Sequence, residues 1–264
     1  MKRLVLAGRA FFGLGVAGMG IQQFIYHEFR PVFLSWPAGM SNQSIWAYIA
    51  GSMLILSGLF IAASNRSRST AIGLGLLFLV MFLGFHLPDQ IKFFQQNKHL
   101  VLGTWINPLK ELALAGCAFI VAASYTGVNL STTNRALLIA GRVLFSLMLI
   151  QFGRSHFVYT NFAATLVPGW LPGHLFWTYF GAIALIGTGI CILLKIQIRF
   201  ASLLLGLMLF IWFLILHIPR AMDAQAADKG NELTSVFQAL AFSGVAFVLA
   251  GIYQKKENEK RFTR

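Results

Sequence analysis

The stretch LLLGLMLFIWFLILHIPRAM, residues 203–222, decides the fold. Its first part, 203–216, carries no charge, and a histidine and a proline follow. A hydrocarbon core about 30 Å thick needs about 20 apolar residues per helical span, and lipid satisfies no backbone polar group. A run of this kind therefore predicts a membrane-spanning helix. The sequence GLGLLFLVMFLGFHLPDQI, residues 73–91, has the same ending and indicates that the element is repeated.

The whole composition agrees with a membrane protein. Of the 264 residues, 57% are hydrophobic and 11% are charged, and the mean hydropathy is +0.71, well above the range of soluble domains. Alternation of period two is absent, so helices are favoured over barrel strands. The chain is predicted to be an all-α integral membrane protein. Apolar stretches predict eight spans, at about 7–26, 43–63, 70–87, 107–125, 136–157, 175–194, 200–217 and 235–253.

An internal repeat divides the chain into two halves. A shift of 133 places GRAFFGLGVAGMGIQQFIYHEF (8–29) over GRVLFSLMLIQFGRSHFVYTNF (141–162). Shifts of 131 and 128 then pair the later spans, so that His86 falls on His217 and Gly116 on Gly244. We expect two four-helix units, 1–130 and 131–254, and a basic tail, 255–264. Because the first stretch matches an internal helix, it is expected to be a retained span rather than a cleaved signal.

The repeat and the charges together predict the orientation. A unit with an even number of spans returns the chain to its starting side, so both halves have the same orientation. One side collects 14 Lys and Arg residues against 2 acidic residues, and the other has 7 against 6. The positive-inside rule therefore places both termini in the cytoplasm and the protein in the cell (inner) membrane. The net charge of +13 then reports topology and not nucleic-acid binding.

The histidines all fall at or beyond the predicted outer ends of the helices. They are His27, His86, His99, His156, His174 and His217. Histidine is the side chain whose charge changes near neutral pH, so a titrating or ligand-binding site is expected on the outer face. His86 and His217 end the third span of each half, and a structural hydrogen bond to the outer loop is the alternative role for each. Pro219 is expected to stop its helix and to bias Ile218 away from helical geometry.

Other outer residues widen the candidate site. Arg154 and His156, in QFGRSHF, have Ile21 and Gln23 as counterparts, so polar groups are enriched in the second half. Their alternative roles are contact with lipid headgroups and a hydrogen bond to a loop carbonyl. Trp177 and Tyr179 belong to a segment rich in aromatic residues and proline. That segment fits either an aromatic belt at the interface or a lid over a pocket that is open to lipid.

Two helix starts are expected on the outer side. Asn107 before Pro108 predicts an N-cap with proline at the first helical position, and residues 235–238, SVFQ, predict a capping box. Glu111 would then lie one turn inside the helix. An acidic residue within the apolar boundary is a candidate functional group, but contact with the interface or pairing with Lys110 is the expected role.

The four-helix unit resembles the DoxX family of bacterial and archaeal membrane proteins. The features that carry the resemblance are Gly141-Arg142, His156-Phe157, Gly187 and Gly189, Arg199 and His217. The resemblance covers 135–253 best and recurs over 4–126. Family members include the membrane subunit of a thiosulfate:quinone oxidoreductase and proteins linked to oxidative-stress complexes. The resemblance implies quinone-linked redox work with a redox partner protein, although this chain departs from the family in its eight duplicated spans.

Two classes of function stay open. In the first, the chain is a quinone-associated membrane subunit, in which His217, His156 and Arg154 line an outer-face pocket with His86, Trp177 and Tyr179 beside them. In the second, it is a non-enzymatic transporter, a lipid-binding protein or a membrane scaffold for a partner complex. No catalytic residue is identified, so the sequence leaves open whether the chain is an enzyme.

Metal and thiol chemistry receive little support from the sequence. Cys117 and Cys191 lie in separate spans without a CxxC motif, which argues against a dithiol redox centre. Zinc-site spacing is absent, so no metal site is predicted. A variant in which His86 and His217 share a metal or haem stays open.

Overall fold

A computed structural model describes residues 2–30, 33–34, 36–37, 40–125 and 131–262. Within these residues the secondary structure is entirely helical. The helices are α1 (Lys2–Tyr26), α2 (Gln43–Ala63), α3 (Arg68–Met81), η1 (Phe82–His86), α4 (Leu87–Asn97), η2 (Leu102–Trp105), α5 (Ile106–Ser124), α6 (Thr132–Val158), α7 (Thr160–Thr165), α8 (His174–Leu194), α9 (Ile198–Trp212), η3 (Phe213–His217), α10 (Ile218–Asp223) and α11 (Ala226–Phe262).

The described residues contain eight helical segments long and apolar enough to cross a membrane, which confirms the predicted number. They are Arg3–Tyr26, Gln43–Ala63, Arg68–Asn97, Leu102–Ser124, Thr132–Val158, His174–Leu194, Ile198–Asp223 and Asp228–Gln254. The third and seventh are longer than predicted, because helix continues past each histidine and proline. The predicted tail, 255–264, continues α11 as far as Phe262, and its last two residues lie outside the described part.

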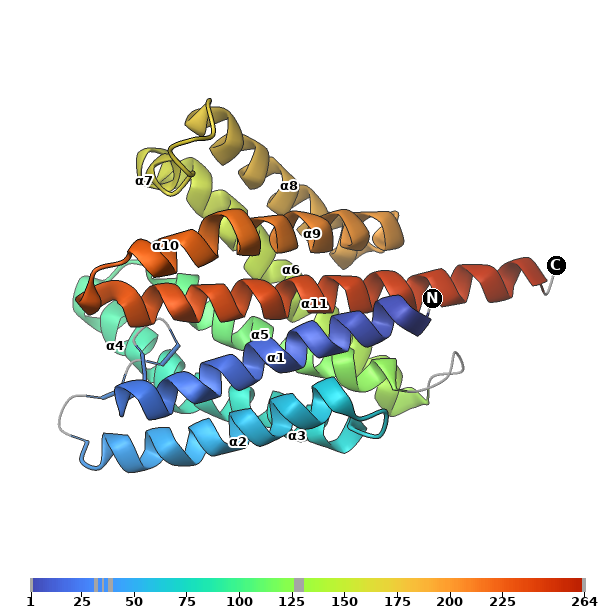
Figure 1. Cartoon of the computed structure of the whole chain (residues 1–264), viewed down its shortest axis with the longest axis horizontal. Helices are drawn as coiled ribbons and strands as arrows, with labels where there is room; N and C mark the ends of the chain where they lie inside the picture. The colour runs from blue at the N-terminus through green and yellow to red at the C-terminus, as the bar shows by residue number, and fades with distance from the viewer. Residues whose placement is uncertain (1, 31–32, 35, 38–39, 126–130, 263–264) are drawn as a thin grey trace.

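The long helices lie side by side along the long axis of the molecule (Figure 1). The start of α1 and the end of α11 lie at one end, which we call the termini end. Helix α1 packs between α2 and α11, and α6 packs between α5 and α8. Helices α5 and α11 also contact each other, and they have the most buried spans. The core of the protein therefore forms around α5 and α11.

Glycines allow these central helices to approach closely. A methyl group at Gly8 of α1 would overlap the carbonyl oxygen of Gly244 of α11, and one at Gly141 of α6 would overlap that of Gly116 of α5. Small residues at such contacts let membrane helices pack through their backbones. The first helix of each half thus packs against the last helix of the other half.

The two proline-containing ends differ from the prediction. Ile218, expected to leave helical geometry, has φ −62° and ψ −54°, and the helix continues as α10. A π-helical turn precedes each proline, and the amide of Ile218 bonds the carbonyl five residues back, at Phe213. Such a turn inserts one extra residue into the hydrogen-bonded turns of the helix. It thereby displaces the backbone carbonyl with which the proline ring would clash. The prediction that Pro219 stops the helix was therefore wrong.

Both predicted helix starts were also wrong. The N-cap of α5 is Trp105 rather than Asn107, because a 3-10 turn, η2, precedes the helix. Ser235 lies well inside α11, where its hydroxyl donates to the carbonyl of Asn231 at 3.2 Å. The polar residues before it extend the helix instead of interrupting it. A capping pattern is local, and tertiary packing supplied the additional turns.

Candidate functional site

The six histidines that were predicted to share the outer side lie in elements at one end of the molecule (Figure 1). This end is opposite the termini end, and we call it the histidine end. His27 follows α1, and His99 follows α4. His156 is in the last turn of α6, and His174 begins α8. His86 and His217 each end a π-helical turn, η1 and η3.

His86 contacts the segment that follows α1. It is buried, and its Nε2 lies 3.1 Å from the carbonyl oxygen of Phe33. The ring of Phe33 packs edge-on against Phe78, and Trp36 stacks on Phe85 at 5.7 Å between centroids. The described part of this segment therefore covers η1 and satisfies His86, as expected for a structural histidine.

His217 has a different environment. Its Nδ1 is buried and has no hydrogen-bond partner among the described residues. The matching connection in the second half forms α7, which packs on α6 and α8 (Figure 1). A loop carbonyl equivalent to that of Phe33 is therefore not supplied to His217. An unsatisfied buried nitrogen costs free energy and needs an explanation.

Charged groups surround His217. The cationic side chains of Lys110 of α5 and Arg220 of α10 lie near it. Arg220 forms an ion pair with Glu232 of α11, with its Nη2 2.5 Å from Oε1, and Glu232 also lies near Lys110. We call Lys110, His217, Arg220 and Glu232 the His217 cluster. It joins α5, η3, α10 and α11, and cationic groups outnumber acidic ones within it.

Glu111 lies beside the cluster in sequence but does not pair with it. Glu111 is 1% exposed, and neither of its carboxylate oxygens has a hydrogen-bond partner in the described part of the chain. The ammonium of Lys110 lies instead over the ring of Phe152, 5.3 Å from its centroid. The expectation that Glu111 reaches the interface or pairs with Lys110 was wrong, because Glu111 is buried without a partner among the described residues while Lys110 lies over Phe152 of α6.

The predicted residues of α6 connect only partly to the cluster. His156 packs edge-on against Phe152 at 5.4 Å, and its Nδ1 lies 2.8 Å from the carbonyl oxygen of the same residue. Phe152 thus lies between His156 and Lys110. Arg154 is half-buried one turn from Phe157. Helix α6 therefore brings one predicted residue, His156, toward the His217 cluster.

The predicted aromatic residues have other contacts. The indole of Trp177 donates to the carbonyl of Pro172 at 3.2 Å. Tyr179 is exposed, and its ring lies 5.7 Å from that of Phe157. These contacts hold the start of α8 against α6 and the preceding turn. The two side chains belong to the α6–α8 surface rather than to the His217 cluster.

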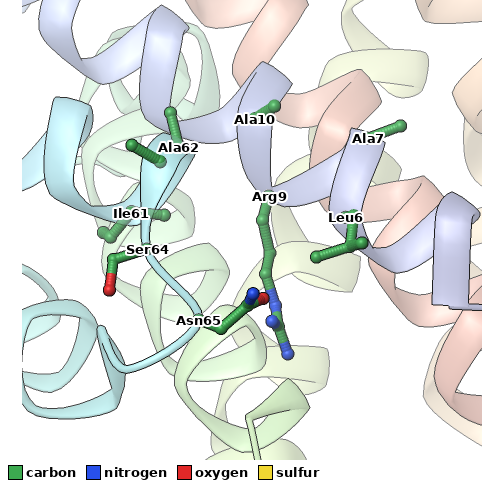
Figure 2. Close-up of a pocket in the computed structure, with 9 residues that line it drawn as sticks. Leu6, Ala7, Arg9, Ala10, Ile61, Ala62, Ser64 and Asn65 are labelled. Carbon is green, nitrogen blue, oxygen red and sulfur yellow. The ribbon is translucent and has the colours of Figure 1, made fainter.

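Sequence reasoning missed several residues of possible function. Arg220 and Glu232 are partners across the turn between α10 and α11, and no residue spacing indicated this. A cavity of about 430 Å³ at the termini end, lined by Leu6, Arg9, Ala62 and Asn65 among others, was also missed (Figure 2). The Gly-Arg pair that recurs at 8–9 and 141–142 was the one available signal for it.

Comparison with known proteins corrects the family resemblance. A family model described as "Domain of unknown function (DUF8561)" matches residues 145–249. The matched family is not DoxX, so the proposed resemblance was wrong, and the quinone and redox implications that rested on it lose their support. The motifs that suggested DoxX are glycines within spans and basic residues at helix ends, and many membrane helices share them. No curated protein matches the chain. No solved structure matches it either.

Proposed function

We propose that the chain is a multi-pass membrane protein of two same-orientation repeats that binds an oxygen-bearing amphipathic ligand at its outer face. The His217 cluster is the proposed site. Binding, rather than a reaction, is the function that the geometry supports. The observation that carries the proposal is the buried Nδ1 of His217, which has no partner in the described part of the chain and lies near the cationic side chains of Lys110 and Arg220.

Matched contacts support the two-repeat arrangement. The pairs Gly8–Gly244 and Gly141–Gly116 are equivalent under the shifts of the sequence repeat. The pair formed by Gly75 and Phe119 is likewise equivalent to that of Gly206 and Phe247. The π-helical turns Phe82–His86 and Phe213–His217 also fall on each other. Related contacts at related positions are what duplication of one unit produces.

The orientation rests on the basic residues. The termini end carries the segments in which Lys and Arg greatly outnumber acidic residues. The positive-inside rule then makes this end cytoplasmic and the histidine end external. A ligand at the His217 cluster would enter from the outer aqueous phase or from the outer leaflet.

The donors of the cluster define the ligand. Lysine and arginine side chains only donate hydrogen bonds, and a neutral imidazole can do so through one nitrogen. Glu232 balances one cation, so the cluster favours a ligand with acceptor oxygens. Phe152 lies beneath Lys110 and supplies an apolar face. A carboxylate or a ring carbonyl on an apolar body fits these groups.

The second half is favoured as the binding half. In the first half, the segment after α1 satisfies His86 and covers η1. In the second half, α7 packs on α6 and α8, and Nδ1 of His217 has no partner among the described residues. One duplicated histidine therefore has a structural partner while the other is left to a ligand.

Native mass spectrometry of the protein extracted with its lipids tests the proposal. We expect a co-purified acidic or carbonyl-bearing amphipath that is lost from His217→Ala and retained by His99→Ala, a control at an exposed histidine. An optical spectrum of the same sample would identify a quinone by its absorption. If the wild-type protein carries no such ligand, or if His217→Ala retains it fully, the proposed site is wrong.

A further inference from the structure

The cavity at the termini end lies between the start of α1 and the end of α2, far from the His217 cluster (Figures 1 and 2). Leu6 and Arg9 come from α1, and Ala62, Ala63 and Asn65 come from the end of α2 and the following turn. Figure 2 shows the guanidinium of Arg9 extending toward the side chain of Asn65. A charged group thus lines one part of the cavity while apolar side chains line the rest.

Arg9 is held by the end of α5. The guanidinium donates from Nε to Ser124 Oγ at 2.9 Å and from Nη2 to the Ser124 carbonyl at 2.5 Å. It also lies over the ring of Tyr125, 3.6 Å from the centroid. Arg9 is only 8% exposed. These contacts fix the charge at the cavity without an acidic partner among the described residues.

The equivalent arginine of the second half also contacts a tyrosine, Tyr253, the counterpart of Tyr125, but its other partners differ. Arg142 donates from Nε to the carbonyl of Ile192 at 3.1 Å and from Nη2 to that of Leu193 at 3.0 Å. These carbonyls belong to the last turn of α8, so Arg142 joins α6 to the end of α8. In the described part of the first half, no guanidinium reaches the matching carbonyls of Ile61 and Ala62. The cavity lies where this arginine contact would otherwise be.

Side-chain size explains why the space is open. Ala62 and Ala63 occupy the positions that Leu193 and Leu194 occupy in the second half. Ala10, which also lines the cavity, corresponds to Val143. Smaller side chains on both walls and an arginine turned toward Ser124 together leave a volume of about 430 Å³.

We propose that this cavity binds the headgroup of a phospholipid with a glycerol phosphodiester, such as phosphatidylglycerol, from the adjoining leaflet. The phosphate accepts hydrogen bonds from Arg9, since a guanidinium suits phosphate geometry. The glycerol hydroxyls donate to carbonyls at the end of α2, where the helix dipole is negative and donors are favoured. The ligand therefore links Arg9 of α1 to the carbonyls at the end of α2. In the second half, Arg142 of α6 binds the carbonyls at the end of α8 directly.

The surroundings favour a lipid over free phosphate. The cavity opens beside spanning helices, and Leu6 at its edge is 37% exposed. Its alanine walls suit the glycerol and the first acyl carbons better than a fully hydrated ion. Basic pockets between membrane helices on the cytoplasmic side are sites for anionic headgroups. Binding here is independent of the proposed site at the histidine end.

Lipid titration of the detergent-purified full chain, read by native mass spectrometry, tests this proposal. We expect phosphatidylglycerol to bind more tightly than phosphatidylcholine. The variant Ala62→Leu introduces the residue that the second half carries at the same position and fills the cavity. Because the leucine side chain occupies space that the headgroup needs, phosphatidylglycerol binding should weaken about tenfold. The matched control is Ala140→Leu, at an exposed position on α6.

A second variant guards against a folding defect. Arg9→Gln removes the charge but leaves the cavity. It should weaken the binding of both lipids, because both carry the phosphodiester, while phosphatidylglycerol stays the tighter of the two because its glycerol hydroxyls keep their partners. Equal affinity for the two lipids, or unchanged affinity in both variants, would overturn the proposal. Displacement of the lipid by millimolar inorganic phosphate would show that the site takes the free ion and would also overturn it.

Discussion

Gly8 and Gly244 bring the first and last long helices into backbone contact, and a methyl group at either position would overlap the other's carbonyl oxygen. We expect Gly8→Ala to separate α1 from α11 and to lower stability by about 1–3 kcal/mol, the usual cost of overpacking. Thermal unfolding in detergent, followed by tryptophan fluorescence, measures this. Gly73→Ala is the control, because a methyl group there meets nothing within 4 Å. Equal effects of the two substitutions would contradict the importance of this contact.

The two π-turn histidines should respond differently to substitution. His86→Leu removes the hydrogen bond to the Phe33 carbonyl and should cost about 1 kcal/mol of stability, a typical value for one such bond. His217→Leu removes a nitrogen that lacks a partner within the described residues, so it should leave stability unchanged or raise it. Parallel unfolding measurements compare the two. A larger loss for His217→Leu would show that its imidazole has a structural role.

Glu111 is expected to reduce stability in the wild-type protein. A buried carboxyl group without hydrogen bonds loses its hydration and gains nothing in return. Glu111→Met should therefore raise the unfolding temperature, with a gain of about 1–2 kcal/mol. Leu112→Met is a suitable control on the same turn of α5. A fall in stability would mean that Glu111 binds a group that is absent from the described contacts.

Tyr125 should make stability depend on alkaline pH. Burial raises the pKa of its hydroxyl, against the opposing effects of the hydrogen bond to Ser67 and the charge of Arg9. The folded protein then holds this proton more tightly than the unfolded chain, in which tyrosine titrates near pH 10. Its contribution is fully present below about pH 10 and is lost as the pH rises through the folded-state pKa.

The variant Tyr125→Phe isolates this effect. It removes the titrating group along with its hydrogen bonds to the carbonyls of Ile61 and Ser64. The stability difference between wild type and variant should be largest near neutral pH and should shrink above about pH 10. Unfolding in detergent across this range measures it. A constant difference would exclude tyrosine titration as the cause.

Much of the fold could be predicted because it depends on local properties. Each span is a long, mostly apolar run, such as 203–216, whose backbone must form its own hydrogen bonds in lipid. The helix ends were less predictable. Pro219 has the local signature of a helix stop, but one π-helical turn accommodates it. Asn107 likewise has the signature of a cap, but a preceding turn extends the helix.

The candidate site could be predicted only in part. His217 was identified from its repeated position. The end of the molecule at which it lies follows from the number of spans that precede it. Its partners Arg220 and Glu232, however, come together through the turn between α10 and α11. Arg9 was visible as a repeated residue, but its contact with Ser124 spans most of one half of the chain. Contacts of this kind depend on which helices become neighbours.

By itself, the sequence determined that this protein has eight spanning helices and that six histidines fall at helix ends away from the chain termini. Apolar length and residue order are sufficient for both. Only the tertiary structure decided that His86 has a carbonyl partner while His217 has none among the described residues, and that Arg9 faces a cavity while Arg142 joins two helices. Equivalent residues differ in this way because the loops and side chains packed around them differ, and no property of the residue itself records that.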